Sequence, residues 1–186
     1  MRKIFYFILS FFSSRLSHSS PEEDAICEKE RQRWGNCTWF EGGKSEEPSF
    51  NQPALVDLKK TVACIRNITC KGSKKLVKFH FDTLVFSMEQ LEGDKIQCVR
   101  KTGQATQLRQ CILDIWPFIH AKQYNGEIIH CTSNIMRNLK CGSEEKRAIM
   151  KAAWAQDYNM RTKLATWNET DGVDNFDEIF DPEDFS

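Results

Sequence analysis

The fold of this 186-residue chain is decided by the stretch Val77-Lys-Phe-His-Phe-Asp-Thr-Leu-Val-Phe-Ser-Met-Glu-Gln-Leu91. Most of its apolar residues recur at intervals of three and four, which is the periodicity of one face of an α-helix. Two phenylalanines, Phe79 and Phe86, lie off that stripe. We therefore predict a helix that is buried on more than one side.

Apolar stripes of the same periodicity predict further helices before and after this one. Because no sustained alternation typical of strands occurs, we predict an all-α bundle of about five or six helices. The stripes, in chain order, are Leu55, Leu58, Val62 and Ile65; Ile96 and Val99; Leu108, Cys111, Ile112, Ile115 and Trp116; Ile128, Cys131, Ile135 and Leu139; and Met150, Trp154, Tyr158, Arg161 and Leu164.

Helix boundaries are marked by proline, glycine and serine. Pro117 is expected to end or kink the helix before it. Gly142 fits the position just past the end of the following helix, and Ser143 is suited to cap the last one. Glu144 and Glu145 then lie near the positive end of that helix, where their charges are favourable.

The first 19 residues have the organisation of a secretory signal peptide: a basic start, a nine-residue stretch that is mostly apolar, and a small polar stretch. The apolar run is about half as long as a membrane span requires. We therefore expect cleavage between residues 17 and 20, an extracellular protein, and no membrane span after cleavage. The remainder divides into an irregular arm containing cysteine and tryptophan (20–53), a helical disulfide domain (54–167) and an acidic tail (168–186).

Eight cysteines follow this leader. An even number of cysteines in a secreted chain predicts four disulfides. A zinc site is the alternative, but the chain has no Cys-x-x-Cys pair, so we predict no metal site. The expected disulfide cysteines are Cys27, Cys37, Cys64, Cys70, Cys98, Cys111, Cys131 and Cys141.

Helix geometry restricts how these cysteines pair. Along a continuous helix Cys64 and Cys70 would be about 9 Å apart, and Cys131 and Cys141 about 15 Å. Bridged Cα atoms lie within about 7 Å of each other, so neither pair is expected to bond. Most bridges must then join one helix to another. Pairing of Cys98 with Cys111 is allowed, since Gly103 can turn the chain between them.

Three Asn-x-Ser/Thr sequons, at Asn36, Asn67 and Asn168, predict N-glycosylation. They agree with a secreted protein, and if used they must lie on an exposed surface.

Charge is distributed unevenly along the chain. Without Arg2, Lys3 and Arg15 of the leader, 23 basic residues face 26 acidic ones, and we expect no nucleic-acid partner. Residues 169–186 hold eight of the acids and no base. Such a composition predicts a disordered tail. The alternative is a segment that docks its aromatic residues on a groove, either of a partner or of the chain's own basic body.

The sequence lacks a recognisable catalytic motif. It contains neither the Gly-x-Ser-x-Gly elbow nor the His-Glu-x-x-His zinc motif, and paired cysteines leave no thiolate nucleophile. Outside the leader the histidines are His80, His120 and His130, and His80 is expected at the edge of the core. We predict no catalytic residue, no cofactor and no enzymatic activity.

Six cysteines over the helical stretch form the pattern Cys64-x5-Cys70, Cys98, Cys111, Cys131, Cys141. Together with the helix stripe before Cys64, this pattern resembles a large nematode family of secreted cysteine-rich domains, catalogued as domain of unknown function nineteen. The resemblance covers roughly residues 27–141. It implies secretion and a helical disulfide fold, and it implies no activity.

These observations favour a secreted, glycosylated, non-enzymatic helical module that binds an extracellular protein partner. A first alternative is a carrier that encloses a small apolar ligand in a helical cavity. A second alternative is an unrecognised secreted hydrolase, which would require one of the three histidines beside a carboxylate in a cleft.

Overall fold

The computed structural model describes residues 25–27, 29–30, 37, 52–65, 69, 71–112, 124–168 and 178–185. These residues contain no strand, which confirms the predicted all-α class. The helices, in chain order, are α3 (Gln52–Ile65), α4 (Lys71–Gln90), η2 (Gly93–Ile96), α5 (Gln97–Lys101), α6 (Ala105–Ile112), α8 (Glu127–Asn138), α9 (Ser143–Asn168) and the 3₁₀ turn η3 (Pro182–Phe185).

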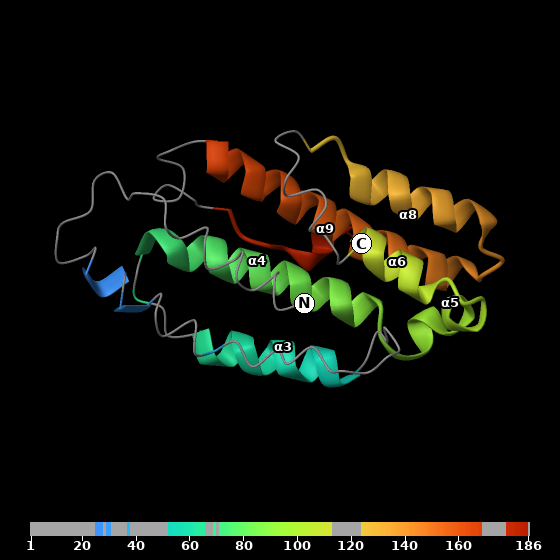
Figure 1. Ribbon diagram of the computed structural model, residues 1–186, viewed down its shortest axis with the longest axis horizontal. Helices are drawn as coiled ribbons and strands as arrows, with labels where there is room; N and C mark the ends of the chain where they lie inside the picture. Colours follow the sequence, from blue (N-terminus) through green and yellow to red (C-terminus); the bar gives the residue numbers. More distant parts are fainter. Residues whose placement is uncertain are drawn as a thin grey trace.

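The long helices lie side by side in the order α3, α4, α9 and α8 (Figure 1). Helix α4 therefore packs against α3 on one side and against α9 on the other. Phe79, which lies off the main apolar stripe of α4, is 2 % exposed. The prediction that this helix is buried on more than one side is confirmed.

Helix α9 presents a different face to the core from the one its sequence predicts. The predicted stripe is wrong at Trp154, which is 45 % exposed, and at Arg161, which is also exposed. Neighbouring helices instead pack on a mixture of large apolar, small and polar side chains. Because small side chains allow close approach of α4 and α8 from two sides, only a narrow strip of α9 faces solvent. The fully buried positions of α9 include Ile149, Ala152, Ala153, Ala155, Gln156 and Asn159.

The boundary between α8 and α9 also differs from the prediction. Helix α8 ends at Asn138, with Leu139 in an extended conformation. Gly142 does not follow it directly; its carbonyl accepts a hydrogen bond from the backbone N–H of Lys146 at 3.1 Å. This is the first bond of α9, so Gly142 holds the capping position and Ser143 is the first helical residue. The acidic first turn of α9 is as expected.

Disulfides staple the bundle between elements. The structure shows the bonds Cys37–Cys64, Cys98–Cys141 and Cys111–Cys131. The two pairs excluded by helix geometry do not form, which confirms that prediction. The allowed pair Cys98–Cys111 does not form either; each of these cysteines bonds a different partner, and the Cys111–Cys131 loop lies within the loop closed by Cys98–Cys141. Cys27 is disulfide-bonded, and Cys70 lies outside the described residues.

The described part of the acidic tail is ordered on the bundle. Phe185 is only 8 % exposed, and η3 contacts α9. The prediction of a disordered tail is therefore wrong for residues 178–185, and the alternative of docking on the chain's own body holds there. The aromatic rings of the tail dock on apolar side chains of α4 and α9. Burial of these rings offsets the entropy that is lost when a short segment becomes ordered.

Several other expectations fall on residues that the structure does not describe. These are the leader, most of the arm, Pro117, His120 and the sequons at Asn36 and Asn67. Asn168 is the last residue of α9. None of the described helices is both long enough and apolar enough to cross a bilayer.

Candidate binding groove

A groove of about 530 Å³ lies where α3, α4 and the C-terminal tail meet. It is open to solvent along one side. Its described lining residues come from three segments that are far apart in the sequence: Lys59, Val62 and Ala63 of α3; Asp82, Val85, Phe86 and Glu89 of α4; and Phe180 and Pro182 of the tail.

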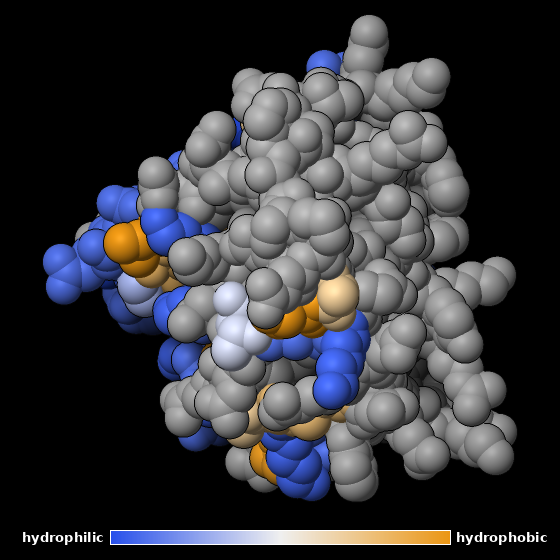
Figure 2. Space-filling model, turned by 90° about the vertical axis from the view of Figure 1, so that its left-hand side faces the viewer, coloured by the Kyte–Doolittle hydropathy of each residue, from blue (hydrophilic) through white to orange (hydrophobic). Residues whose placement is uncertain are grey.

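Apolar side chains form the floor of the groove. Val62 and Val85 are partly buried, and Ala63 is exposed at the surface of α3. The ring of Phe86 lies 5.5 Å from that of Phe180, so the wall contributed by the tail is continuous with the floor contributed by α4. On the face of the molecule in Figure 2, the described hydrophobic residues appear as small patches beside hydrophilic ones.

Aromatic packing holds the tail wall in place. Phe180 packs edge-on against Phe79 of α4 at 6.1 Å and stacks on Phe185 at 5.7 Å. Phe185 in turn lies 6.0 Å from Tyr158 of α9. Aromatic pairs in such geometries contribute about 0.5–1.5 kcal/mol beyond their buried area. The tail thus bridges α4 and α9.

Hydrogen bonds fix the two ends of the ordered tail. Glu178 accepts hydrogen bonds from the hydroxyls of Tyr158 and Thr162, two residues one turn apart on α9. Burial, together with the bond to Glu178, raises the pKa of Tyr158 to about 12. At the other end, the carboxylate of Asp181 accepts the backbone N–H of Glu183 at 2.9 Å and thereby caps η3.

Ion pairs mark the rim of the groove. Lys59 Nζ lies 2.6 Å from a carboxylate oxygen of Glu89 and links α3 to α4. This hydrogen bond and the negative charge raise the pKa of Lys59. Further along α4, Asp82 pairs with Lys78. Both cations are more than half exposed, so these pairs contribute little to stability and mainly set the charge of the rim.

A ladder of buried polar groups lies between α4 and α9. The side-chain amide of Asn159 lies 3.0 Å from Nδ1 of His80 and donates to Gln156 Oε1 at 3.3 Å. Gln156 Nε2 donates to the carbonyl of Thr83, which also accepts the hydroxyl of Ser87 at 2.9 Å. Ser87 reaches across to the carbonyl of Ala152 at 3.2 Å. Each of these buried side chains thus has at least one hydrogen-bond partner within the protein, as buried polar groups usually do.

The described histidines do not form a common site. His80 is buried in the ladder between α4 and α9, which agrees with a structural histidine. His130 is exposed on α8, which packs on the other side of α9. The two described histidines therefore lie on opposite sides of α9 and do not share a site.

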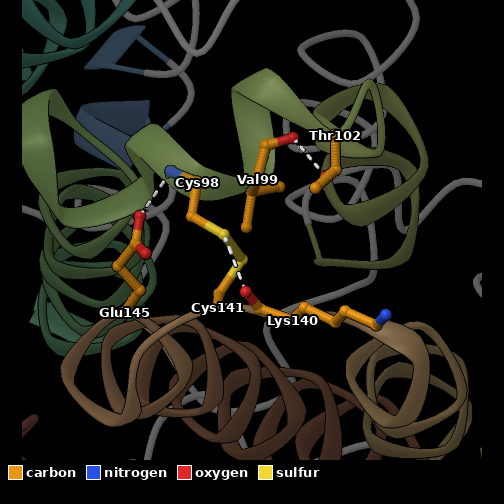
Figure 3. Close-up of a disulfide and its surroundings, with 6 residues drawn as sticks. All are labelled: Cys98, Val99, Thr102, Lys140, Cys141 and Glu145. Carbon is orange, nitrogen blue, oxygen red and sulfur yellow. Dashed lines mark hydrogen bonds between the residues drawn. A yellow bond between two sulfur atoms is a disulfide. The ribbon is translucent and has the colours of Figure 1, made fainter.

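The grouping of Cys98, Cys141 and Glu145 has the composition of a metal site. Its two sulfurs are joined to each other in a disulfide, as Figure 3 shows, and a disulfide offers no thiolate ligand. The carboxylate of Glu145 accepts the backbone N–H of Cys98 at 2.6 Å. The disulfide and this hydrogen bond together form a structural staple that ties α5 to the start of α9.

Sequence reasoning missed both the groove and the ladder. Neither has a local motif, because each is assembled from residues on separate helices. The signal that was available is the pair Ala152-Ala153, whose small side chains indicate close helix packing beside Gln156 and Asn159.

Comparison with known protein families, with curated proteins and with solved structures finds no significant match.

Proposed function

We propose that this protein is a secreted, glycosylated, non-enzymatic helical module that binds an extracellular protein through the groove between α3, α4 and the tail. The open groove is the observation that supports the proposal. It exposes apolar side chains that the fold leaves uncovered, and it surrounds them with charged groups. An apolar centre with a polar rim is the usual organisation of a protein-binding surface.

Ordering of the tail supports the same proposal. The tail forms a third wall of the groove because Phe180 packs against Phe86 of α4. Preformed walls lower the entropic cost of binding, since the partner does not have to order them.

A carrier of a small apolar ligand is the second candidate. A volume of about 530 Å³ suits a small molecule, and aromatic rings line part of the wall. The open side of the groove favours the protein partner, because an apolar ligand gains most from complete enclosure.

Two valines of α3 provide a matched test. Val62 lines the groove, whereas Val56 is 49 % exposed on the same helix and is not among the lining residues. The protein and its Val62→Gln and Val56→Gln variants would be secreted from their own cells, cross-linked in place and recovered with their neighbours. We expect the Val62→Gln variant alone to lose its principal cross-linked partner.

Equal recovery of the same partner by both variants would remove the groove from the proposal. Native mass spectrometry of the uncross-linked protein separates the two candidates, because a co-purifying small molecule lost from Val62→Gln favours the carrier. The same spectrum reports leader cleavage and glycans.

A further inference from the structure

We infer that the groove receives a basic amphipathic segment of the partner, with the docked acidic tail as its negatively charged wall. The inference rests on the proposed function and adds the chemical class of the binding segment. It is carried by the distribution of charge around the apolar floor.

Carboxylates outnumber cations at the groove. Among the described residues, the groove lining and residues 181–184 of the adjoining tail contribute five carboxylates against the ammonium groups of Lys59 and Lys78. The carboxylates belong to Asp82, Glu89, Asp181, Glu183 and Asp184.

The remaining negative charge lies on the tail. Glu89 is neutralised by Lys59, and Asp82 by Lys78. The tail residues Asp181, Glu183 and Asp184 are exposed, and no described cation pairs with them. Aromatic packing of Phe180 and Phe185 holds these charges beside the apolar floor.

This arrangement selects the chemistry of the occupant. Val62, Val85 and Phe86 can accept apolar side chains, while lysine or arginine on the flanking face of the same segment would pair with the tail carboxylates. A helix with an apolar stripe and a basic stripe satisfies both requirements. Polyanions such as nucleic acid or an acidic membrane surface are disfavoured by like charge, and so is the acidic tail of a second copy.

Fluorescence anisotropy can test the inference with synthetic peptides. The probe is a labelled amphipathic Leu–Lys peptide of about four helical turns, roughly 14 residues, and the control peptide has Glu in place of every Lys. We expect the full protein to bind the Lys peptide, to lose affinity as salt is raised, and to bind the Glu peptide at least tenfold more weakly.

Paired charge variants locate the site. Glu183→Gln/Asp184→Asn removes two exposed tail carboxylates, and Asp94→Asn/Glu144→Gln removes two exposed carboxylates outside the groove lining. We expect the first double variant to weaken binding roughly three- to tenfold and the second less than twofold. Val62→Gln should weaken it more than Val56→Gln. Melting curves establish that each variant is folded.

The outcomes are distinguishable. Preference for the Glu peptide, or equal loss in the two double variants, overturns the basic-segment inference. If the Lys peptide fails to bind while Val62→Gln still loses its cellular partner, the inference is overturned and the proposed function stands. If Val62→Gln and Val56→Gln behave alike in both assays, the groove is not the binding site. Both the basic-segment inference and the proposed function are then overturned.

Discussion

The two sides of helix α9 are held by different kinds of interaction. On the side of α8, the core is apolar, and two disulfides, Cys98–Cys141 and Cys111–Cys131, join the surrounding elements. On the side of α4, the contact runs through hydrogen-bonded side chains such as Asn159 and Gln156, and the tail is added by aromatic rings.

This difference affects how precisely each contact fixes the position of one helix along another. Apolar side chains tolerate small shifts of one helix along another, whereas each polar group in the ladder must meet its own partner or remain buried without one. We therefore expect the α8 side to contribute most of the stability and the α4 side to set the register that aligns the groove and tail. Four measurements test this division, from the largest expected effect to the smallest.

Removing a staple should have the largest effect. Cys98→Ala/Cys141→Ala opens a loop whose ends are 43 residues apart. The unfolded chain then gains entropy, and we expect the free energy of unfolding to fall by about 4 kcal/mol. Chemical denaturation under non-reducing conditions measures it. If this variant loses less free energy of unfolding than a variant with a broken ladder, the α8 side does not contribute more stability than the α4 side.

Breaking the ladder should have the next largest effect. Asn159 is 0 % exposed, and its amide contacts both His80 and Gln156. Asn159→Ala leaves buried polar groups without their partner, and we expect a loss of about 2 kcal/mol. Asn134→Ala on the exposed face of α8 is the control and should change stability by less than about 0.5 kcal/mol. Similar values for both would show that the ladder does not hold the helices together.

Loosening the tail should affect the groove more than the bundle. Phe180→Ala removes a ring that packs on Phe79 and Phe86, whereas neighbouring Ile179 is 77 % exposed. We expect a loss of about 1–2 kcal/mol, mostly as undocking of the tail. Limited proteolysis should cut the tail faster in Phe180→Ala than in Ile179→Ala. Equal rates for the two variants would show that Phe180 does not hold the tail.

Alkaline pH should have the smallest effect. The pKa of Tyr158 is raised from 10.0 to about 12 in the folded protein. Its contribution to docking is therefore fully present below pH 10 and is lost as the pH rises towards 12. We expect tail proteolysis to increase over this window in the wild type and to increase less in Tyr158→Phe. Ultraviolet absorbance of tyrosinate follows the same titration, and identical profiles would exclude Tyr158 as the cause.

The sequence predicted those features that depend on local geometry. Apolar periodicity located α3, α4, α6 and α8, and the rise of a helix correctly excluded Cys64–Cys70 and Cys131–Cys141 as bonded pairs. Both arguments need only the spacing of residues along one helix.

Features that depend on two helices at once could not be predicted in this way. Trp154 suggested an apolar face of α9, but it is exposed. Gln156 and Asn159 are fully buried, because α4 supplies hydrogen-bond partners for them. The acidic composition of the tail favoured disorder. It did not reveal that Phe79 and Tyr158, far apart in sequence, form a docking surface for Phe180 and Phe185.

The nesting of these two disulfides determines what happens to the molecule when its backbone is cut. A single backbone cut anywhere between Ile112 and His130 leaves two pieces joined by both Cys98–Cys141 and Cys111–Cys131. A nicked protein would thus migrate as one species until it is reduced, and the groove and tail, which lie outside this segment, would stay attached to each other. A single cut in this part of the polypeptide would therefore not separate the molecule while both disulfides remain oxidised.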